Sequence, residues 1–555
     1  MSGVKTESID HYGLVMGMIQ ELGIMDVIDQ ELPTKSESKI VTHAMAVAAM
    51  ILNGLGYANK QLYLTPRFFE KKALKQLFES NTVEAKHFNK ESLGRTLDKL
   101  FDYGVSELYE KIAKKALKAL DLIPSTIHLD STSFHLDGKY ANQEQECDEE
   151  DDKPIPITIT QGYSRDHHPE LNQVILNMIV EHQAGIPIWI QPSDGNQVDT
   201  QAFTTIVKHI ASMKNAVCTQ IKVISDAALF TAKTIQEFKK NSMLFISRVP
   251  SKLKQAKEIL KNYNEKEFIT LDENYQAIVY TIEYEEMQQH WVLYKSTYAK
   301  SREDKTIQRE YQKKQDQESK LLAKLQRTPY YCEADATQAL QETTQKLQTL
   351  SIISKRLIIK AKYKTKGRPK PNTVPDHYEY HWEIETQQNK EYLKEEQSQK
   401  SGLFILATND MTLSPKELLD EYKSQQRVER GFRFLKSPQF LSDAMFLKSP
   451  KRIEAMLMIM TLSLLVYSAL EHKIRKELEA QNKTFPNQLG KPAQNPTTRW
   501  VFENFHEIQI VFIEELKKQV IANLLERNVF ILDLLGPPYW QYYRVEKKMG
   551  NWGAQ

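Results

Sequence analysis

The chain has 555 residues, a length that suggests roughly three or four domains. Hydrophobic residues make up 41% of it, which is enough for folded cores and excludes wholesale disorder. The 74 Lys and Arg residues nearly balance the 72 Asp and Glu residues, so a nucleic-acid partner can be argued only from local charge. Cys147, Cys218 and Cys332 lie far apart in sequence, which excludes a disulfide framework or a zinc site and is typical of a reducing cytosol.

The chain shows no pattern for export, for a membrane span or for nucleotide binding. Its first residues, MSGVKTESIDHYG, lack the basic start and apolar core of a signal peptide, which predicts a cytoplasmic protein. The most apolar stretch, Ala455–Leu470, is shorter than the roughly 18–20 residues that span a bilayer, so we predict a buried core helix. Neither a GxGxxG motif nor a P-loop occurs, which argues against nucleotide-driven chemistry.

The N-terminal third of the chain changes from helical to strand patterns near residue 120. The apolar spacing in Ala44–Leu55 and Glu91–Phe101 predicts helices, whose charges are either solvated or used to bind DNA ends. Next come apolar segments typical of strands: STIHLDSTSF after Pro124, then 154–164, 172–182 and 186–192. A helix (Thr200–Met213), a strand (Gln220–Asp226), a second helix (Leu229–Lys240) and a last strand (Met243–Val249) complete a mixed α/β sheet pattern.

Further strands and polar helices interrupt this pattern. Strands are predicted at 276–284 and 290–296, helices at Lys300–Gln326 and Ala334–Leu350, and strands from Ile352 and over Asp376–Glu385. A strand at Leu403–Thr408 and a helix at Lys416–Lys436 follow, and the chain reads as helical to near residue 535. We therefore predict a helical N-terminal domain (1–120), the first part of a core (121–250), an inserted strand-rich and helical domain (251–400), the last core strand and a helix (401–445), and a helical C-terminal region (446–555).

Asp130, Asp226 and Glu429 stand out by their placement. Asp130 lies in a strand, Asp226 ends an apolar strand, and Glu429 lies in the helix Lys416–Lys436. A carboxylate in a buried strand is costly unless it is paired or binds a cation, so converging carboxylates would suit Mg²⁺ or Mn²⁺. Each residue also has a simpler role: Asp130 as a turn residue, Asp226 as the N-cap of a helix from Ala227, and Glu429 as a solvated helix residue.

The helix that carries Glu429 has a distinctive spacing. Tyr422, Gln425, Glu429 and Lys436 fall within one helical stripe, beside the apolar stripe of Val428, Phe432 and Leu435. The segment is also strongly basic, through Lys423, Arg427, Arg430, Arg433 and Lys436. An inward-facing acid surrounded by cations suits a metal ion at a phosphodiester.

These residues carry a family resemblance. The string YKSQQRVERGFRFLKS resembles the Y-(2)-R-(3)-E-(6)-K signature of bacterial DDE transposases, in the insertion sequence 4 branch and within it the insertion sequence 1634 group. Further landmarks in order along nearly the whole chain agree: YGLVMGMIQELG, MILNGLGY, LGRTLDKLFDYG, HLDSTSF, GYSRDHHPEL, FISRVP and LSPKELLDEY.

The resemblance implies a ribonuclease-H-like mixed sheet core that is interrupted by the inserted domain, because the gap between Asp226 and Glu429 is too long for the core alone. It further implies that Asp130, Asp226 and Glu429 form an acidic triad that holds two Mg²⁺ (or Mn²⁺) ions. Tyr422 and Lys436 match positions that contact DNA phosphates in relatives. Gln425 departs from the signature, which has Arg at that position, and a neutral amide cannot replace a charged fork.

The implied activity is metal-dependent cleavage and strand transfer at the ends of a mobile element. The implied partners are double-stranded DNA, as terminal inverted repeats and target, and a second copy of the chain in a synaptic homodimer on the nucleoid. A catalytically inactive DNA-binding protein derived from a transposase is the alternative, and the Lys/Gln-rich helices at 300–350 leave a helical scaffold protein as a third possibility. Metal-dependent cleavage would distinguish the first from the other two.

A row of lysines in the inserted domain is a second candidate DNA contact. Residues 351–375 include eight Lys and Arg and no Asp or Glu. In a strand over Ile358–Lys366, alternate residues face one side, namely Lys360, Lys362, Lys364 and Lys366. The row would either bind DNA phosphates or protect an edge strand from aggregation.

Overall fold

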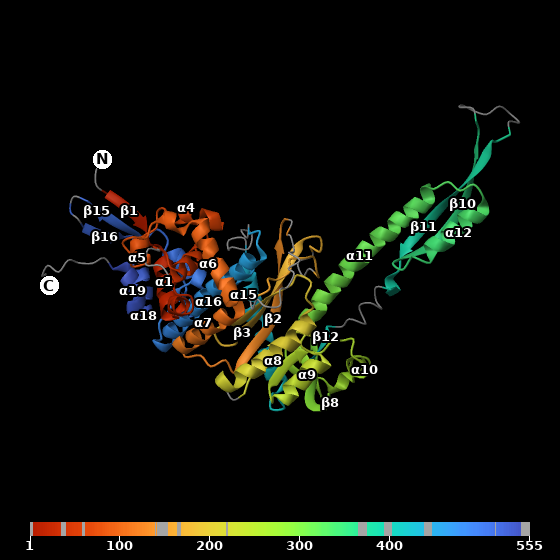
Figure 1. The fold of residues 1–555 in the computed structure, drawn as a ribbon. Coiled ribbons are helices and arrows are strands. Elements are labelled where there is room, and N and C mark those ends of the chain that lie inside the picture. Colours follow the sequence, from red (N-terminus) through yellow and green to blue (C-terminus); the bar gives the residue numbers. More distant parts are fainter. Residues whose placement is uncertain are drawn as a thin grey trace.

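The computed structural model describes residues 4–34, 40–57, 61–138, 140, 154–163, 168–217, 220–364, 374–392, 402–437, 447–514, 516 and 518–544 (Figure 1). The side chains of residues 213–217 and of Arg427 also lie outside this description.

A nine-stranded mixed sheet forms the centre of the molecule. Its order is β4-β3-β2-β5-β6-β12-β9-β8-β7. The central strands β2, β5 and β6 are parallel, and every other neighbouring pair is antiparallel. The strands are β2 (Thr126–Leu136), β3 (Asn172–Glu181), β4 (Pro187–Ser193), β5 (Lys222–Ser225), β6 (Leu244–Arg248), β7 (Ile269–Asp272), β8 (Tyr275–Tyr284), β9 (Met287–Ser296) and β12 (Leu403–Thr408). The prediction of a mixed α/β sheet is therefore confirmed.

We predicted a strand over 154–164, but the described part of it, residues 154–163, makes only an isolated bridge between Thr160 and Gln173. Pro154 and Pro156 lack the amide hydrogens that a ladder needs. Side chains accept from the neighbouring amides instead: the Ile157 N–H donates to Glu454 and the Thr158 N–H donates to Asp194.

The helices α8 (Asp199–Val217), α9 (Ala232–Lys240) and α10 (Lys254–Asn262) alternate with or follow the parallel strands along the chain, and a 3₁₀ turn η3 (Glu265–Glu267) precedes β7. The strands β7, β8 and β9 belong to the segment that we assigned to an inserted domain, yet they extend the same sheet. The boundary proposed at residue 250 therefore falls inside the sheet.

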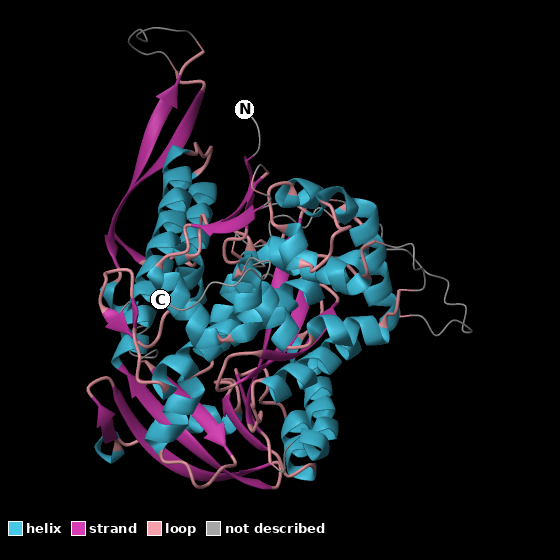
Figure 2. Ribbon diagram, turned by 90° about the vertical axis from the view of Figure 1, so that its left-hand side faces the viewer, coloured by secondary structure: helices cyan, strands magenta, loops and turns pink. Residues whose placement is uncertain are grey.

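Within that segment, the described residues 297–364 and 374–388, which we call the arm, project away from the sheet (Figure 1). The arm comprises α11 (Thr297–Arg327), α12 (Glu333–Thr344), β10 (Leu350–Lys362) and β11 (His377–Gln388). Its two strands form an antiparallel hairpin that extends beyond the helices (Figure 2). A small apolar core joins these elements through Leu322, Leu325, Leu340, Leu350 and Ile384.

The two ends of the chain form one helical region. In it β15 pairs with both β1 and β16, and the long helix α16 packs against α1, α3 and α6. The elements are β1 (Val4–Ser8), α1 (Tyr12–Glu21), α2 (Ile24–Glu31), α3 (His43–Leu55), η1 (Leu62–Leu64), α4 (Thr65–Phe69), α5 (Leu74–Leu77), η2 (Ala85–Phe88), α6 (Lys90–Tyr103), α7 (Val105–Ala119), α16 (Pro450–Ala480), β13 (Phe485–Pro486), β14 (Pro492–Ala493), α17 (Thr498–Asn504), β15 (Gln509–Ile513), β16 (Lys518–Ala522), α18 (Glu526–Leu535), α19 (Pro537–Trp540) and η5 (Gln541–Tyr543). The sequence predicted a helical C-terminal region, but the structure also contains the strands β13, β14, β15 and β16 there.

The helix α16 is long and apolar enough to cross a membrane, but 83% of its most apolar window is buried inside the protein. Its side chains from Ala455 to Val466 are all buried. The prediction of a buried core helix is confirmed.

Candidate active site

Asp130 and Asp226 lie at the same level on neighbouring parallel strands. The register of β2 and β5 pairs Thr126 with Lys222 and ends at Leu129 opposite Ser225, and the two aspartates are the next residues on each chain. Both side chains are half-buried. Because the strands are parallel, the two carboxylates stand side by side where β5 ends.

The local backbone fixes Asp226 without making it a helix cap. Its Oδ1 accepts the Ala228 N–H at 2.9 Å, and its carbonyl oxygen accepts the Ser247 hydroxyl at 2.7 Å. The following helix α9 begins only at Ala232, and Thr231 is its N-cap. The simpler role that we considered for Asp226, an N-cap of a helix from Ala227, is therefore wrong.

The helix that we predicted over Lys416–Lys436 is two helices, α14 (Pro415–Lys423) and α15 (Gln426–Leu435). Ser424 lies at their junction, and its hydroxyl donates to the Glu421 carbonyl oxygen at 2.5 Å. A serine that bonds back to the preceding turn competes with the helix ladder and bends helices. The junction separates Tyr422, on α14, from Glu429, on α15.

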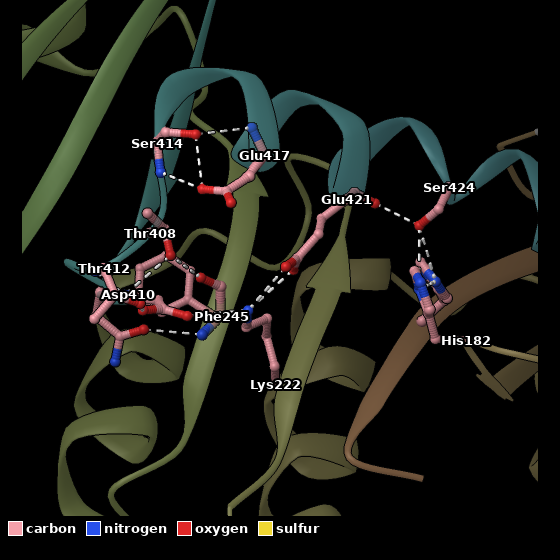
Figure 3. Close-up of polar contacts among 12 residues, drawn as sticks. His182, Lys222, Phe245, Thr408, Asp410, Thr412, Ser414, Glu417, Glu421 and Ser424 are labelled. Atoms are coloured by element: carbon pink, nitrogen blue, oxygen red, sulfur yellow. Dashed lines mark hydrogen bonds and ion pairs between the residues drawn. The ribbon is translucent and has the colours of Figure 1, made fainter.

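Two polar clusters attach this helix pair to the sheet (Figure 3). Lys222, the first residue of β5, forms ion pairs of 3.0 Å with both Glu421 and Asp410. Burial alone would lower the pKa of Lys222, but its hydrogen bonds to the two carboxylates raise it overall. The helix α14 is thereby held against β5, the strand that leads directly into Asp226.

The second cluster joins the helix junction to β2 and to the end of β3. His128 Nε2 and His182 Nδ1 lie 3.0 Å apart, and their rings are stacked. The Ser424 hydroxyl lies 3.2 Å from His182 Nδ1 and 3.4 Å from His128 Nε2. His128 precedes Asp130 by two residues on the same strand, so this contact fixes the start of α15 relative to Asp130.

The Tyr422 hydroxyl is influenced by the charges of the three predicted catalytic acids. Burial, with a smaller effect from the negative charges of Asp226, Glu429 and Asp130, raises the pKa of the Tyr422 hydroxyl to about 12, and the positive charge of Arg248 opposes this rise. Of the three acids, Glu429 also lines one pocket together with Tyr422. A tyrosine with this pKa is protonated at neutral pH and can donate a hydrogen bond.

Glu429 is exposed on α15, whereas Asp130 and Asp226 are half-buried. Among the residues that the structure describes, no three His, Cys, Asp or Glu side chains lie close enough together to hold one metal ion. The metal-binding role of the three acids therefore stays a prediction.

A pocket of about 550 Å³ opens beside Glu429. The predicted residues Tyr422 and Gln425 line it, and Gln425 is only 8% exposed. Three cations also line it: Arg248 at the end of β6, Arg302 near the start of α11, and Lys423 on α14.

The remaining basic residues of α15 are spread around it. Arg430 and Arg433 are exposed, and Lys436 is half-buried at the C-cap. The Arg430 Nε donates to the Gln426 carbonyl oxygen at 3.4 Å. The side chain of Arg427, which we also predicted to bind DNA, lies outside the described residues.

The lysine row of the arm is only partly as we predicted. Lys360 and Lys362 lie on β10, but the strand ends at Lys362, so Lys364 follows it and Lys366 is outside the described residues. Lys362 forms an ion pair with Glu379 at 3.1 Å, and Lys364 forms one with Asp376 at 3.2 Å. Acidic side chains of the segment leading into and along β11 therefore offset part of the positive charge.

Sequence reasoning missed Arg248, Arg302 and Lys222. Arg248 stands in the landmark FISRVP, but nothing in the local pattern places it beside Tyr422. Lys222 begins the strand that ends at Asp226, and its ion-pair partners come from a segment nearly 200 residues later. Only the strand order brings these residues together.

Comparison with known proteins assigns the chain to a family. A family model described as "Transposase DDE domain" matches residues 123–466, and a model described as "Domain of unknown function (DUF4277)" matches residues 4–114. No curated protein matches. The chain is also similar to a solved structure described as a piggyBac transposase synaptic complex with hairpin DNA, with 10% identity, a TM-score of 0.37, and coverage of 99% of this chain and 90% of that chain. A TM-score this low does not establish a shared fold. The DDE model, however, covers more than half of the chain, and the protein therefore belongs to the DDE transposase family.

Proposed function

We propose that this transposase cuts DNA at the ends of its own mobile element and joins them to a target, and that it belongs to the insertion sequence 1634 group of the insertion sequence 4 branch. One observation carries the proposal: the parallel register of β2 and β5 sets Asp130 beside Asp226, and the helix α15, which bears Glu429, packs on β2. Carboxylates at the ends of adjacent parallel strands are well placed for phosphodiester chemistry.

The sheet order supports a ribonuclease-H-like core. The run β4-β3-β2-β5-β6 places three antiparallel strands next to two strands that are parallel to β2. Helix α14 packs on β5, β6 and β12, and α15 packs on β2, which brings Glu429 over the strand that carries Asp130. In this arrangement the last acid reaches the site from a helix that follows the arm.

The donor set suits Mg²⁺ or Mn²⁺, because carboxylate oxygens are the ligands that these hard cations prefer. Asp130 and Asp226 would hold two such ions, with Glu429 as a further ligand. When bound, the ions would activate water or a 3′-hydroxyl and stabilise charge on the attacking and leaving oxygens.

The protein's own side chains would orient the DNA. Tyr422 remains protonated and would donate a hydrogen bond to a phosphate oxygen. The helix α15 would supply positive charge through Arg427, Arg430, Arg433 and Lys436. Contacts of these side chains with phosphates would position the duplex without reading its base sequence. The partners would be terminal inverted repeats and target DNA, bound by a homodimer in the cytoplasm, and the helical N-terminal region would bind the DNA ends.

The test separates cleavage from binding. We expect Asp130→Asn, Asp226→Asn and Glu429→Gln each to abolish Mg²⁺-dependent nicking of an end-containing duplex and to leave gel-shift binding largely intact, because phosphate contacts supply most of the affinity. Asp137→Asn is the matched control, since Asp137 is exposed just after β2. Nicking retained in the Asp226 variant would exclude its catalytic role. Binding without any nicking by the unaltered chain would identify an inactive DNA-binding descendant.

A further inference from the structure

The pocket beside Glu429 contains more positive charge than its own acids can balance. Arg248, Arg302 and Lys423 line it, and none of them forms an ion pair with another residue in the part of the chain that the structure describes. Of the two acids in the lining, Glu303 accepts the Gly402 N–H at 2.8 Å and Glu429 is assigned to catalysis above. Among the described residues these three cations form no ion pair, although Lys423 acts on Asp272 at longer range, so the pocket is suited to an anionic ligand.

Aromatic rings hold two of these cations in place. The Arg248 guanidinium carbon is 5.7 Å from the centre of the Phe404 ring, and Lys423 Nζ is 3.7 Å from the centre of the Tyr275 ring. A cation over a ring face is stabilised and loses some of its freedom before any ligand binds. The pocket is therefore preorganised for an anion, which lowers the entropic cost of binding.

The position of Arg248 points to the site of chemistry. Its backbone is fixed in the sheet, because it pairs with Leu406 of β12 at the end of β6. Its charge acts on the Tyr422 hydroxyl more strongly than the charge of Asp226, Glu429 or Asp130 does. Arg248, Tyr422 and Glu429 also line the same pocket, which places the guanidinium beside a predicted catalytic acid.

We infer that Arg248 binds a DNA backbone phosphate next to the one that is cut, with Lys423 and Arg302 as additional contacts, and that it supplies the positive charge absent at Gln425. This inference rests on the proposed function. Gln425 lines the same pocket but is almost fully buried and neutral. A guanidinium offers a phosphate two parallel hydrogen bonds, which an amide cannot match.

The experiment measures how DNA affinity depends on salt, without divalent metal, on a duplex made from the DNA that flanks the coding sequence. Each phosphate neutralised contributes about 0.9 to the slope of log K against log salt. Arg248→Gln should lower the slope by about 0.9, and the double variant Arg248→Gln/Gln425→Arg should restore it, because both positions reach the same pocket. Lys257→Gln, an exposed change on α10, is the charge-matched control.

Thermal melting of every variant detects a folding defect. Arg248→Lys is a second control, because it keeps the positive charge and should therefore keep the slope of log K against log salt. A slope in Arg248→Gln equal to that of the unaltered chain would overturn the inference, as would an equal fall in Lys257→Gln. The failure of the proposed function has a different signature: normal salt dependence with no nicking under Mg²⁺. If the unaltered chain nicks DNA but Arg248→Gln leaves the salt slope unchanged, the proposed function stands and the phosphate contact of Arg248 is refuted.

Discussion

Glu454 is a half-buried carboxyl near the N-terminal end of the long apolar helix α16. Its Oε2 accepts the Ile157 N–H at 3.3 Å and so ties the proline-rich segment 154–160 to α16. Burial raises the pKa of Glu454 from 4.5 to about 7, and the charge of Asp194 adds to this effect. The folded protein therefore holds a proton here that the unfolded chain releases near pH 4.5.

This proton makes stability depend on pH. Because the folded pKa is raised, the stabilising contribution is fully present below pH 4.5 and is lost as the pH rises through about 7. We expect Glu454→Gln, which keeps the acceptor for Ile157, to flatten the fall in Tm between pH 4.5 and 7.5. Glu479→Gln, an exposed change on the same helix, should leave the curve unchanged. Identical pH profiles for Glu454→Gln and the unaltered chain would contradict the assignment.

At the scale of elements, Lys222 joins a strand to a helix. Lys222→Met should leave Asp410 and Glu421 facing each other without a cation, because both carboxylates pair with the same ammonium group. Breaking a largely buried ion pair on one side costs on the order of 3 kcal/mol of unfolding free energy. Nicking should fall more than DNA binding, since α14 leads into the helix of Glu429.

Chemical denaturation and nicking assays check this prediction. The triple variant Lys222→Met/Asp410→Asn/Glu421→Gln is the control, because it removes the unpaired charges and should recover most of the lost stability. An unfolding free energy in Lys222→Met within about 0.5 kcal/mol of the unaltered value would show that the cluster is not a stabilising link.

The α14–α15 pair shows how far sequence reasoning reaches. Helical periodicity predicted that Tyr422 and Glu429 share a helical segment, and the segment is helical. It could not predict the junction at Ser424, because the contacts that accompany it come from His128 and His182 on the sheet. Local patterns predict elements, whereas long-range contacts decide how elements bend.

The same limit applies to the candidate site. Asp226 was recognisable because it ends an apolar strand, and its position beside Asp130 follows from the order of β2 and β5. Arg248 carries no local signal, since a single arginine at a strand end is common. Its role depends on β12, which pairs with β6 only after the chain returns from the arm.

At the scale of the whole molecule, the arm presents its lysines far from the sheet. Replacing Lys360, Lys362, Lys364 and Lys366 with Gln should lower the slope of log K against log salt by up to about three or four units if all four contact phosphates. The ion pairs of Lys362 with Glu379 and of Lys364 with Asp376 reduce the charge available to DNA. We therefore expect a smaller fall than that limit.

These pairs also provide the control. Glu379→Gln with Asp376→Asn removes the competing carboxylates and should make the slope steeper, opposite to the lysine variant. Salt titrations of both variants on the same duplex measure this. If the two variants fold normally and show the same slope of log K against log salt, the lysines do not contact DNA. Their role would then be to protect an edge strand from aggregation.

The length of α11 sets a minimum for the DNA that the protein can engage. Its base lines the pocket beside Glu429 through Arg302, and its 31 residues rise about 46 Å to the hairpin of the arm. One turn of B-DNA spans about 34–36 Å, or roughly 10 base pairs. A duplex that reaches both the pocket and the hairpin must therefore run for more than one helical turn, roughly 13–14 base pairs, so a substrate of a single turn would lack the outer contacts.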